Sequence, residues 1–497
     1  MNNNTAIIVG GGLGGLFTGA ILAKNGFRVT VLEKCAVPGG GLQTFSRHGR
    51  SFDAGMHILG GLQPGGNITR ICEYLGIRHI LKTVHENIID TIHYVADNVT
   101  VTLPRGREAF TDYLVRLFPE NEAELHSFVE KMYALADEVG FFHLRESEDY
   151  MTVYSDDFFA PITEIIDRYI SNPMLRDILA FISPMYGGRK GVTPAYIHAI
   201  IFVLYVEGQG KFVGGARQLT DALCGVICEA GGEIKTNSSV TAVGIADGRV
   251  TDVKTADGKS YSADYYISSV HPQRLLDLVP ADAFKRAYSK RIKSLPNSYS
   301  AFQAFFIMKP GSFPYLPGAN FLINKHSDTW ELGESGSDWP KGLMYITPAG
   351  VPDTVVVNAV MPFSEVKQWE GSRLGKRPAD YCVWKEEKLA AIVRQMQSVY
   401  PDFAEKIDYV ETASPLTIRD YFDVPEGSLY GFARDSANIL AYQMAPVTRI
   451  PNLLLTGQCI NLHGLCGVPL TAILTVEAIL GRNVIVRAIN NLKIADE

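Results

Sequence analysis

The chain has 497 residues, too many for one ordinary hydrophobic core, so we expect two or three domains. With 46% hydrophobic and 20% charged residues it has the composition of a globular protein, and its net charge of −7 argues against nucleic-acid binding, which needs a basic surface. The longest apolar run, 195–206, is interrupted by His198 and is too short to span a membrane. An apolar strand begins at Thr5 without a basic leader, so we expect no signal peptide.

The seven cysteines are odd in number and scattered along the chain. Cys224 and Cys228 lie one helical turn apart, but no second Cys or His pair has the spacing of metal ligands. We therefore expect incidental or buried thiols, no metal site and a reducing cytoplasmic location.

The first predicted elements are a strand, a glycine turn and a helix. Residues 5–9 form a β-branched run that leads into six residues containing five glycines, and a helical pattern follows to Gly26. Gly10 permits the tight turn, Gly12 lets the backbone approach a pyrophosphate, and Gly15 lets the helix pack closely on the strand. The free N–H groups of the helix would then face the phosphates.

The next predicted strand, 28–34, strengthens this interpretation. It carries Glu33, eighteen residues after Gly15, where an acid can accept the hydroxyls of an adenosine ribose. A second glycine turn, 39–41, follows it. The three signals together predict a bound adenine dinucleotide.

Further along, the pattern indicates that the chain leaves this unit and returns. Residues 75–205 are predicted to be mostly helical. The return is a helix over 217–230 and four strands, over 233–235, 240–245, 249–254 and 264–268. Strands over 299–308 and 354–361, a helix over 379–399, a strand over 452–456 and a helix over 469–481 complete the predicted elements. Pro469 suits the first turn of the last helix, and Gly481 suits its end.

Several motifs together resemble one family of flavoproteins. They are Phe52–Gly60, the Gly214-Gly215 pair, the segment 417–431 and Thr456–Thr471. In this order, after the glycine turn, they resemble the flavoproteins that include bacterial phytoene desaturases, carotenoid isomerases and retinol saturases. The resemblance covers essentially the whole chain, and Asp53–Gly60 is most similar to the saturase and isomerase branch.

The resemblance implies an α/β fold, with a three-layer (ββα) Rossmann-type FAD-binding domain and an inserted α+β substrate domain. The FAD-binding domain would comprise 1–74, 208–295 and 440–497. The substrate domain would comprise a helical part, 75–207, and a sheet part, 296–439.

The resemblance also implies FAD as cofactor. Its predicted contacts are Gly10, Gly12, Leu13, Gly14, Gly15, Glu33, Lys34, Gly40, Gly41, Leu42, His57, Val240, Gly457, Gln458, Gly467, Val468 and Thr471. Many relatives have Arg after the paired glycines, where this chain has Gly41, Leu42 and Gln43, and Asp where this chain has Gln458. A helix beginning near Pro469 would direct free N–H groups at the negative charge of reduced flavin. No second nucleotide fingerprint is found, so we expect an external electron partner.

The implied substrate is a hydrophobic polyene or isoprenoid whose C=C bond exchanges a hydride with flavin N5. His57 and His463 are the candidates for proton transfer, and a structural hydrogen-bonding role is the alternative for each. Tyr205 and Tyr430 are candidates for lining the substrate path. Reduction or isomerisation is the favoured reaction, and desaturation is the alternative.

Two other functions remain open: a lipid escort protein that uses no flavin, and an amine-oxidising flavoenzyme, which the C-terminal motif fits poorly. The basic run 285–293 is interleaved with Phe284, Tyr288 and Ile292. It predicts either contact with the inner face of an anionic membrane or a solvated helix face.

Overall fold

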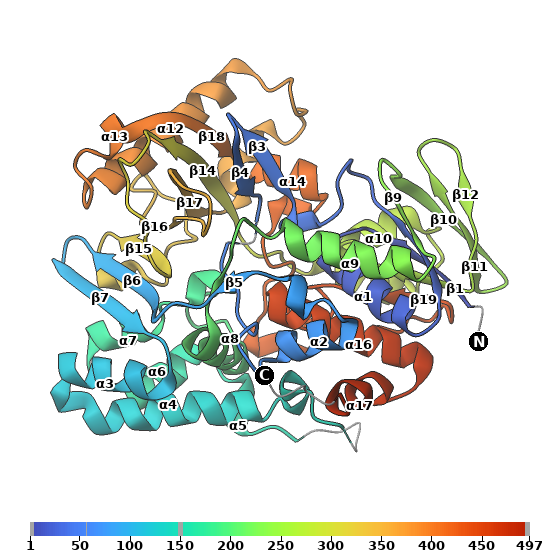
Figure 1. The fold of residues 1–497 in the computed structure, drawn as a ribbon, viewed down its shortest axis with the longest axis horizontal. Helices are drawn as coiled ribbons and strands as arrows, with labels where there is room; N and C mark the ends of the chain where they lie inside the picture. The colour runs from blue at the N-terminus through green and yellow to red at the C-terminus, as the bar shows by residue number, and fades with distance from the viewer. Residues whose placement is uncertain (1–3, 56, 148–152, 493–497) are drawn as a thin grey trace.

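The first strand of the chain lies in the middle of a parallel sheet, and the glycine turn and helix that follow it pack beside this sheet. The computed structural model describes residues 4–55, 57–147 and 153–492. Five parallel strands pair in the order β19-β13-β1-β2-β9 (Figure 1). They are β1 (Thr5–Val9), β2 (Arg28–Leu32), β9 (Glu233–Lys235), β13 (Tyr265–Ser268) and β19 (Leu453–Leu455). Since these strands are far apart in sequence, the chain leaves the sheet and returns to it twice.

Alternating side chains of β1 build a layer on each face of this sheet. Ala6 and Ile8 pack into the core shared with helices α1 (Leu13–Lys24), α9 (Arg217–Glu229) and α16 (Gly464–Leu480). Ile7 and Val9 pack into a second core with a small antiparallel sheet, β10 (Val240–Ala246), β11 (Arg249–Thr255) and β12 (Ser260–Tyr261). This arrangement confirms the predicted Rossmann-type ββα fold.

A larger sheet lies beside the first one and has the order β18-β14-β17-β16-β15-β6-β7. Its strands are β6 (Ile88–Tyr94), β7 (Val99–Pro104), β14 (Ser300–Met308), β15 (Ala319–Ile323), β16 (Gly342–Ile346), β17 (Thr354–Met361) and β18 (Ile407–Ala413). Phe302 and Phe306 of β14 pack with helix α12 (Ala379–Gln397) in one core. Ala301 and Gln303 point to the opposite face, which therefore stays free to line a cavity.

Helices fill the space beneath this second sheet (Figure 1). They are α3 (Arg107–Leu117), α4 (Glu122–Asp137), α5 (Asp156–Phe159), α6 (Ile162–Tyr169), α7 (Pro173–Leu179) and α8 (Ala195–Gly208). Helix α8 contains the apolar run of the sequence, and His198 within it is fully buried, 2.8 Å from the hydroxyl of Tyr186. Within the described part of the chain, no helix has both the length and the apolar character needed to cross a membrane.

Shorter elements connect these layers. The helices among them are α2 (Asn67–Leu75), α10 (Pro272–Leu278), α11 (Arg286–Ser294), α13 (Phe403–Lys406), α14 (Pro415–Phe422), α15 (Ile439–Tyr442) and α17 (Val484–Asn490). The strands among them are β3 (Thr44–Arg47), β4 (Arg50–Asp53), β5 (Thr83–Val84) and β8 (Lys211–Phe212).

Two of the sequence predictions are corrected by the structure, which also contains strands β15, β16 and β18 that the sequence pattern did not predict. The segment expected to be mostly helical begins with strands β5, β6 and β7, because the alternating residues of β6 complete the larger sheet by pairing with β15. The last helix begins at Gly464 and not at Pro469, so Pro469 lies inside α16. Most other predicted strands and helices agree within two residues with the observed ones, and the domain boundaries stay predictions.

Candidate active site

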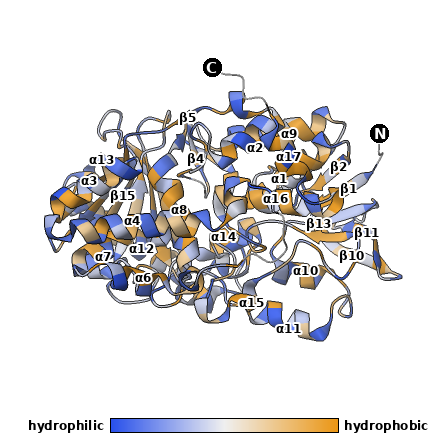
Figure 2. Ribbon diagram, turned by 90° about the horizontal axis from the view of Figure 1, so that it is seen from below, coloured by the Kyte–Doolittle hydropathy of each residue, from blue (hydrophilic) through white to orange (hydrophobic). Residues whose placement is uncertain are grey.

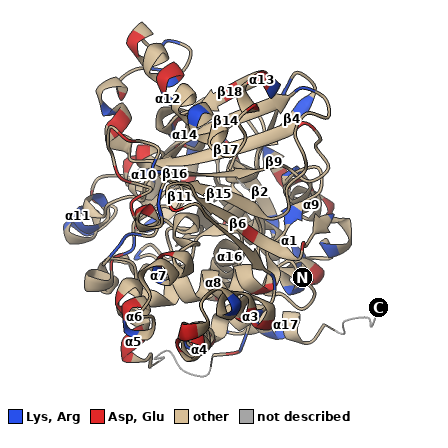
Figure 3. Ribbon diagram, turned by 90° about the vertical axis from the view of Figure 1, so that its left-hand side faces the viewer, with Lys and Arg blue, Asp and Glu red and all other residues tan. Residues whose placement is uncertain are grey.

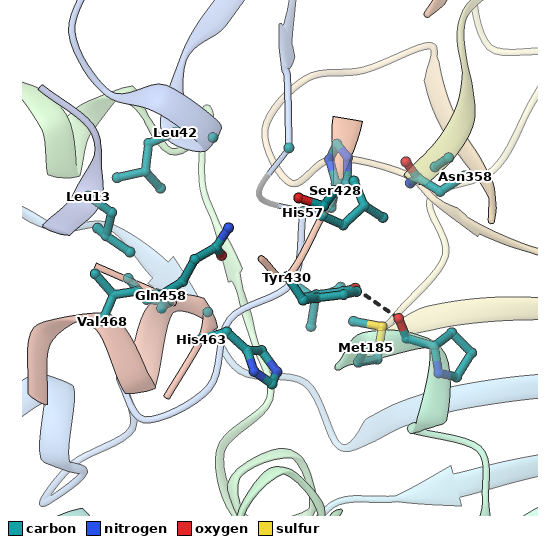
Figure 4. Close-up of a pocket in the computed structure, with 18 of the residues that line it drawn as sticks. Leu13, Leu42, His57, Met185, Asn358, Ser428, Tyr430, Gln458, His463 and Val468 are labelled. Carbon is teal, nitrogen blue, oxygen red and sulfur yellow. Dashed lines mark hydrogen bonds between the residues drawn. The ribbon is translucent and has the colours of Figure 1, made fainter. Parts of the chain in front are cut away.

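A cavity of about 350 Å³ lies between the two sheets and is lined by residues of the larger sheet and of the turns that follow strands of the parallel sheet (Figure 4). One wall is the glycine turn after β1, with Gly12, Leu13 and Gly14. The opposite wall is the face of the larger sheet that includes Gln303 and Asn358. The cavity thus joins a dinucleotide-binding turn to a second, mostly apolar compartment.

The glycine turn brings backbone segments together where no side chain would fit. A Cβ atom on Gly15 would lie 2.0 Å from the carbonyl oxygen of Gly10, and one on Gly14 would lie 2.8 Å from the Cα of Gly457. Gly12 caps helix α1, and no side chain takes up the N–H groups of its first turn in the described structure. These N–H groups are available to an anionic group such as a pyrophosphate.

Glu33 lies next to this turn and is held by the backbone. Its carboxylate accepts hydrogen bonds of 2.7 Å from the N–H groups of Gly11 and Cys35. A carboxylate has lone pairs for further bonds, so Glu33 can also accept the hydroxyls of a ribose. The N–H of Ser238 donates to the Glu33 carbonyl at 2.7 Å, which brings the start of β10, with Val240, beside this site.

The second glycine turn completes the same wall. The N–H of Gly39 donates to the carbonyl of Gly11 at 2.7 Å, so the two turns are bonded together. Gly40, Gly41 and Leu42 line the cavity. A Cβ atom on Gly41 would meet no atom within 4 Å, which leaves room for a cofactor against this backbone.

The C-terminal motif contributes Gly457, Gln458, His463 and Val468 to the cavity. Helix α16 starts at Gly464, with His463 as its N-cap. The free N–H groups predicted to face the flavin therefore belong to the residues just after His463 and not to those near Pro469.

Seven of the predicted cofactor contacts lie outside the cavity lining, and four of them are held by contacts of their own. Gly467 packs against Leu462, since a Cβ atom there would lie 2.4 Å from the Leu462 Cβ, and Thr471 donates to the Gly467 carbonyl at 3.1 Å. Lys34 donates instead to the carbonyl of Asp420 at 3.1 Å, and Val240 begins β10. Gly10, Gly15 and Glu33 also do not line the cavity, but they shape the turn beside it.

Both predicted histidines line the cavity. Burial lowers the pKa of His57 to about 4 and that of His463 to about 3, so both imidazoles are neutral at pH 7. The Nε2 atoms of both rings have no hydrogen-bond partner among the described residues. These nitrogens are available to a bound ligand.

Both predicted tyrosines, Tyr205 and Tyr430, line the cavity as well. The hydroxyl of Tyr430 donates to the carbonyl of Pro184 at 2.8 Å, and its ring lies 5.3 Å from that of His463 (Figure 4). Burial raises the pKa of both phenols, so they stay protonated at neutral pH.

A second, small cavity lies next to the first. It is lined in part by Asp53, His57 and Lys211, so His57 borders both cavities. Burial raises the pKa of Asp53 to about 6 and lowers that of Lys211 to about 8. The ammonium of Lys211 donates to the carbonyl of Leu316 at 2.8 Å and lies 3.7 Å from the carboxylate of Glu86.

Sequence reasoning missed the wall formed by the larger sheet. Gln303 and Asn358 are polar residues within the apolar strand patterns of 299–308 and 354–361. Polar residues within apolar strands were the one signal in the sequence that could have indicated this wall. Only the strand pairing shows that the two residues lie side by side and face a cavity.

Comparisons with known proteins agree with this geometry. A family model described as flavin containing amine oxidoreductase matches residues 13–480. The all-trans-retinol 13,14-reductase of Rattus norvegicus is 27% identical over 96% of this chain and 86% of that protein. The chloroplastic prolycopene isomerase of Arabidopsis thaliana is 21% identical over 94% and 81%. An oxidoreductase structure from Methanosarcina mazei has a TM-score of 0.66 and 16% identity, over 95% of this chain and 100% of that one, which shows a shared fold.

FAD is the cofactor, and the described residues fit it. The uncapped first turn of α1 suits its pyrophosphate, and Glu33 suits its adenosine ribose. Gly41 leaves space against its backbone, and Gln458 and Val468 lie opposite Leu42 across the cavity (Figure 4).

Replacing Glu33 with Gln is expected to weaken FAD binding about tenfold. The amide removes the negative charge and brings an NH₂ group toward one of the backbone N–H donors. The measurement is the Kd of FAD for the apoprotein, followed by quenching of FAD fluorescence. The exposed Glu229 supplies the control, Glu229→Gln, which should bind FAD like the wild type. Equal affinity in both variants would contradict the assigned role of Glu33.

Replacing His463 with Asn should make folding less sensitive to acid. The unfolded imidazole takes up a proton near its ordinary pKa of about 6.5, whereas the folded one does so only near about 3. The stability that a neutral His463 contributes is therefore complete above this window and falls as the pH falls through it, by up to about 1.4 kcal/mol per pH unit. Chemical unfolding at about pH 7.5 and about pH 5 measures this, and equal losses in wild type and variant would refute it.

Proposed function

This chain belongs to the family of flavin-containing amine oxidoreductases, and we propose that it reduces or isomerises carbon–carbon double bonds of a hydrophobic polyene. It is an FAD-dependent oxidoreductase. The proposal is supported by relatives named as a retinol reductase and a prolycopene isomerase. The observation that carries it is the chemistry of the cavity wall.

No Lys, Arg, Asp or Glu is found among the described residues that line the main cavity. A protonated amine would be buried there without a counter-ion, at a high free-energy cost. An uncharged polyene would instead meet side chains such as Ile201, Leu204, Phe321 and Val360. The wall therefore favours a polyene over an amine substrate.

When bound, FAD supplies the hydride exchange, and a reduction also needs one proton at the neighbouring carbon. In our proposal His57 relays this proton: its neutral imidazole takes a proton from the ammonium of Lys211 and passes it to the carbon, so that His57 ends neutral and Lys211 ends as the amine. His57 suits this relay because it borders the main cavity and also the small cavity that holds Lys211, whose pKa is lowered to about 8. His463 lines the main cavity but not the small one, and its charged neighbour Arg434 lowers its pKa further, so we assign it the role of a hydrogen-bonding residue beside Tyr430.

The test is to add polyenes to the anaerobically reduced enzyme and to record the flavin spectrum and the products. We expect either reoxidation of the flavin with a product that has one C=C bond fewer, or a geometric isomer with the flavin still reduced. A newly desaturated product as the sole outcome, or no reaction with any polyene, would refute the proposal.

The variant His57→Gln separates proton transfer from binding in the same assay. It should still bind FAD and polyene but form the saturated product about 100-fold more slowly. The matched variant His463→Gln should form the saturated product at most of the wild-type rate. If His463→Gln were instead the slower variant, His463 and not His57 would be the proton-transfer residue.

We further propose peripheral contact with the inner face of an anionic membrane. Helix α11 exposes Lys290 and Lys293 and appears as a basic element at the edge of the molecule (Figure 3). Arg291 donates to the carbonyl of Leu440 at 3.4 Å, which joins α11 to the apolar helix α15 (Figure 2). Leu440 is 77% exposed, whereas Phe284 and Ile292 of the basic run are buried. Basic and apolar groups thus share one surface, as membrane contact requires.

Flotation with vesicles of phosphatidylserine and phosphatidylcholine tests this contact. The wild type should float with these vesicles, and Lys290→Glu/Lys293→Glu should reduce the bound fraction several-fold, because each cation near such a surface contributes about 1 kcal/mol. The exposed pair Lys367→Glu/Lys376→Glu is the charge-matched control. A wild type that stays unbound would leave α11 as a solvated helix face.

We also propose that the protein is located in the cytoplasm and that its electron partner is an external one.

A further inference from the structure

One rung of the larger sheet forms a continuous strip of the cavity wall. Gln303 of β14 pairs with Asn358 of β17, Asn358 pairs with Met344 of β16, and Met344 pairs with Phe321 of β15. All four residues line the cavity. Since directly paired residues of neighbouring strands point to the same face, the strip is polar at one end and apolar at the other.

The polar end contains a donor that the protein itself does not use. The side-chain amide of Gln303 donates to Oδ1 of Asn358 at 2.7 Å and thereby fixes the orientation of the Asn358 amide. Nδ2 of Asn358 is buried and has no hydrogen-bond partner among the described residues. The hydroxyl of Ser428, a residue only 2% exposed, is likewise unpartnered there and lines the same cavity. Buried donors without partners are rare in native proteins, so they point to a ligand acceptor.

The position of Asn358 separates it from the cofactor side. Figure 4 shows it across the cavity from Leu13, Leu42 and Val468, with Tyr430 between the two sides. A polyene reacting near the glycine turns could therefore place one end against Asn358.

The charge of the cavity wall limits which chemical group the substrate can carry at the end that lies against Asn358. Because the described lining has no cation, an ionised carboxylate would remain uncompensated there. A hydroxyl or carbonyl oxygen carries no charge and accepts a hydrogen bond from an amide N–H.

We infer that Asn358, oriented by Gln303, binds an uncharged oxygen at one end of the substrate, which is therefore a polyene alcohol, aldehyde or ketone. This inference rests on the proposed function and specifies its substrate class. A pure hydrocarbon would leave the Asn358 donor unpaired and is disfavoured for that reason.

The experiment compares the Kd values of two probes for the oxidised holoenzyme. The probes are all-trans-retinol and its deoxy hydrocarbon, in which a methyl group replaces the CH₂OH group. We expect retinol to bind about tenfold more tightly. Asn358→Leu should abolish this preference, and Met344→Leu, on the same rung, should change both Kd values by the same factor. Asn358→Thr keeps a hydroxyl on a strand-compatible side chain and should keep part of the preference if the leucine variant misfolds.

Equal Kd values for the two probes in the wild type would overturn the inference and leave the proposed function standing. A preference that persists in Asn358→Leu, with its flavin spectrum unchanged, would do the same. Failure of both probes to bind, together with no reaction of any polyene with the reduced enzyme, would instead overturn the proposed function. The two failures are therefore distinguishable.

Discussion

The close approach of backbone segments at the glycine turns is the constraint on which the active site depends. The turn after β1 folds tightly on itself at Gly15, meets the segment after β19 where Gly14 faces the Cα of Gly457, and is bonded to the turn after β2 by the N–H of Gly39. A side chain on Gly14 or Gly15 would force these backbone segments apart. With only backbone present, N–H groups and open space remain for a dinucleotide at the edge of the parallel sheet.

The placement of charge divides the site into compartments with different chemistry. The main cavity has no charged residue in its described lining, and the imidazoles of His57 and His463 are neutral there because burial disfavours the cation. Ionisable groups are collected in the neighbouring small cavity, with Asp53 and Lys211. His57 is the residue that touches both compartments. An apolar substrate and a proton supply can thus be adjacent without a buried charge beside the substrate.

The larger sheet does more than enclose the substrate. Because side chains alternate along its strands, one face of the sheet packs against α12 through residues such as Phe302 and Phe306. The other face is free to contact a ligand in the cavity. On that second face, Gln303 and Asn358 interrupt an apolar surface with a single oriented amide pair. A few polar atoms are enough to select a substrate in such a wall, because a ligand that leaves a buried donor unpaired binds less tightly.

The sequence by itself determined the dinucleotide unit, because that unit depends on local patterns. The strand and glycine turn through Gly15 and the acid Glu33 fold as the sequence predicts, and so do the strands 299–308 and 354–361 of the larger sheet. Only the tertiary structure decided that α16 begins at Gly464 and that Lys34 turns toward Asp420. It alone decided that Asn358 meets Gln303 at the cavity. The physical reason is that these features depend on contacts between residues far apart in sequence, which local periodicity does not encode.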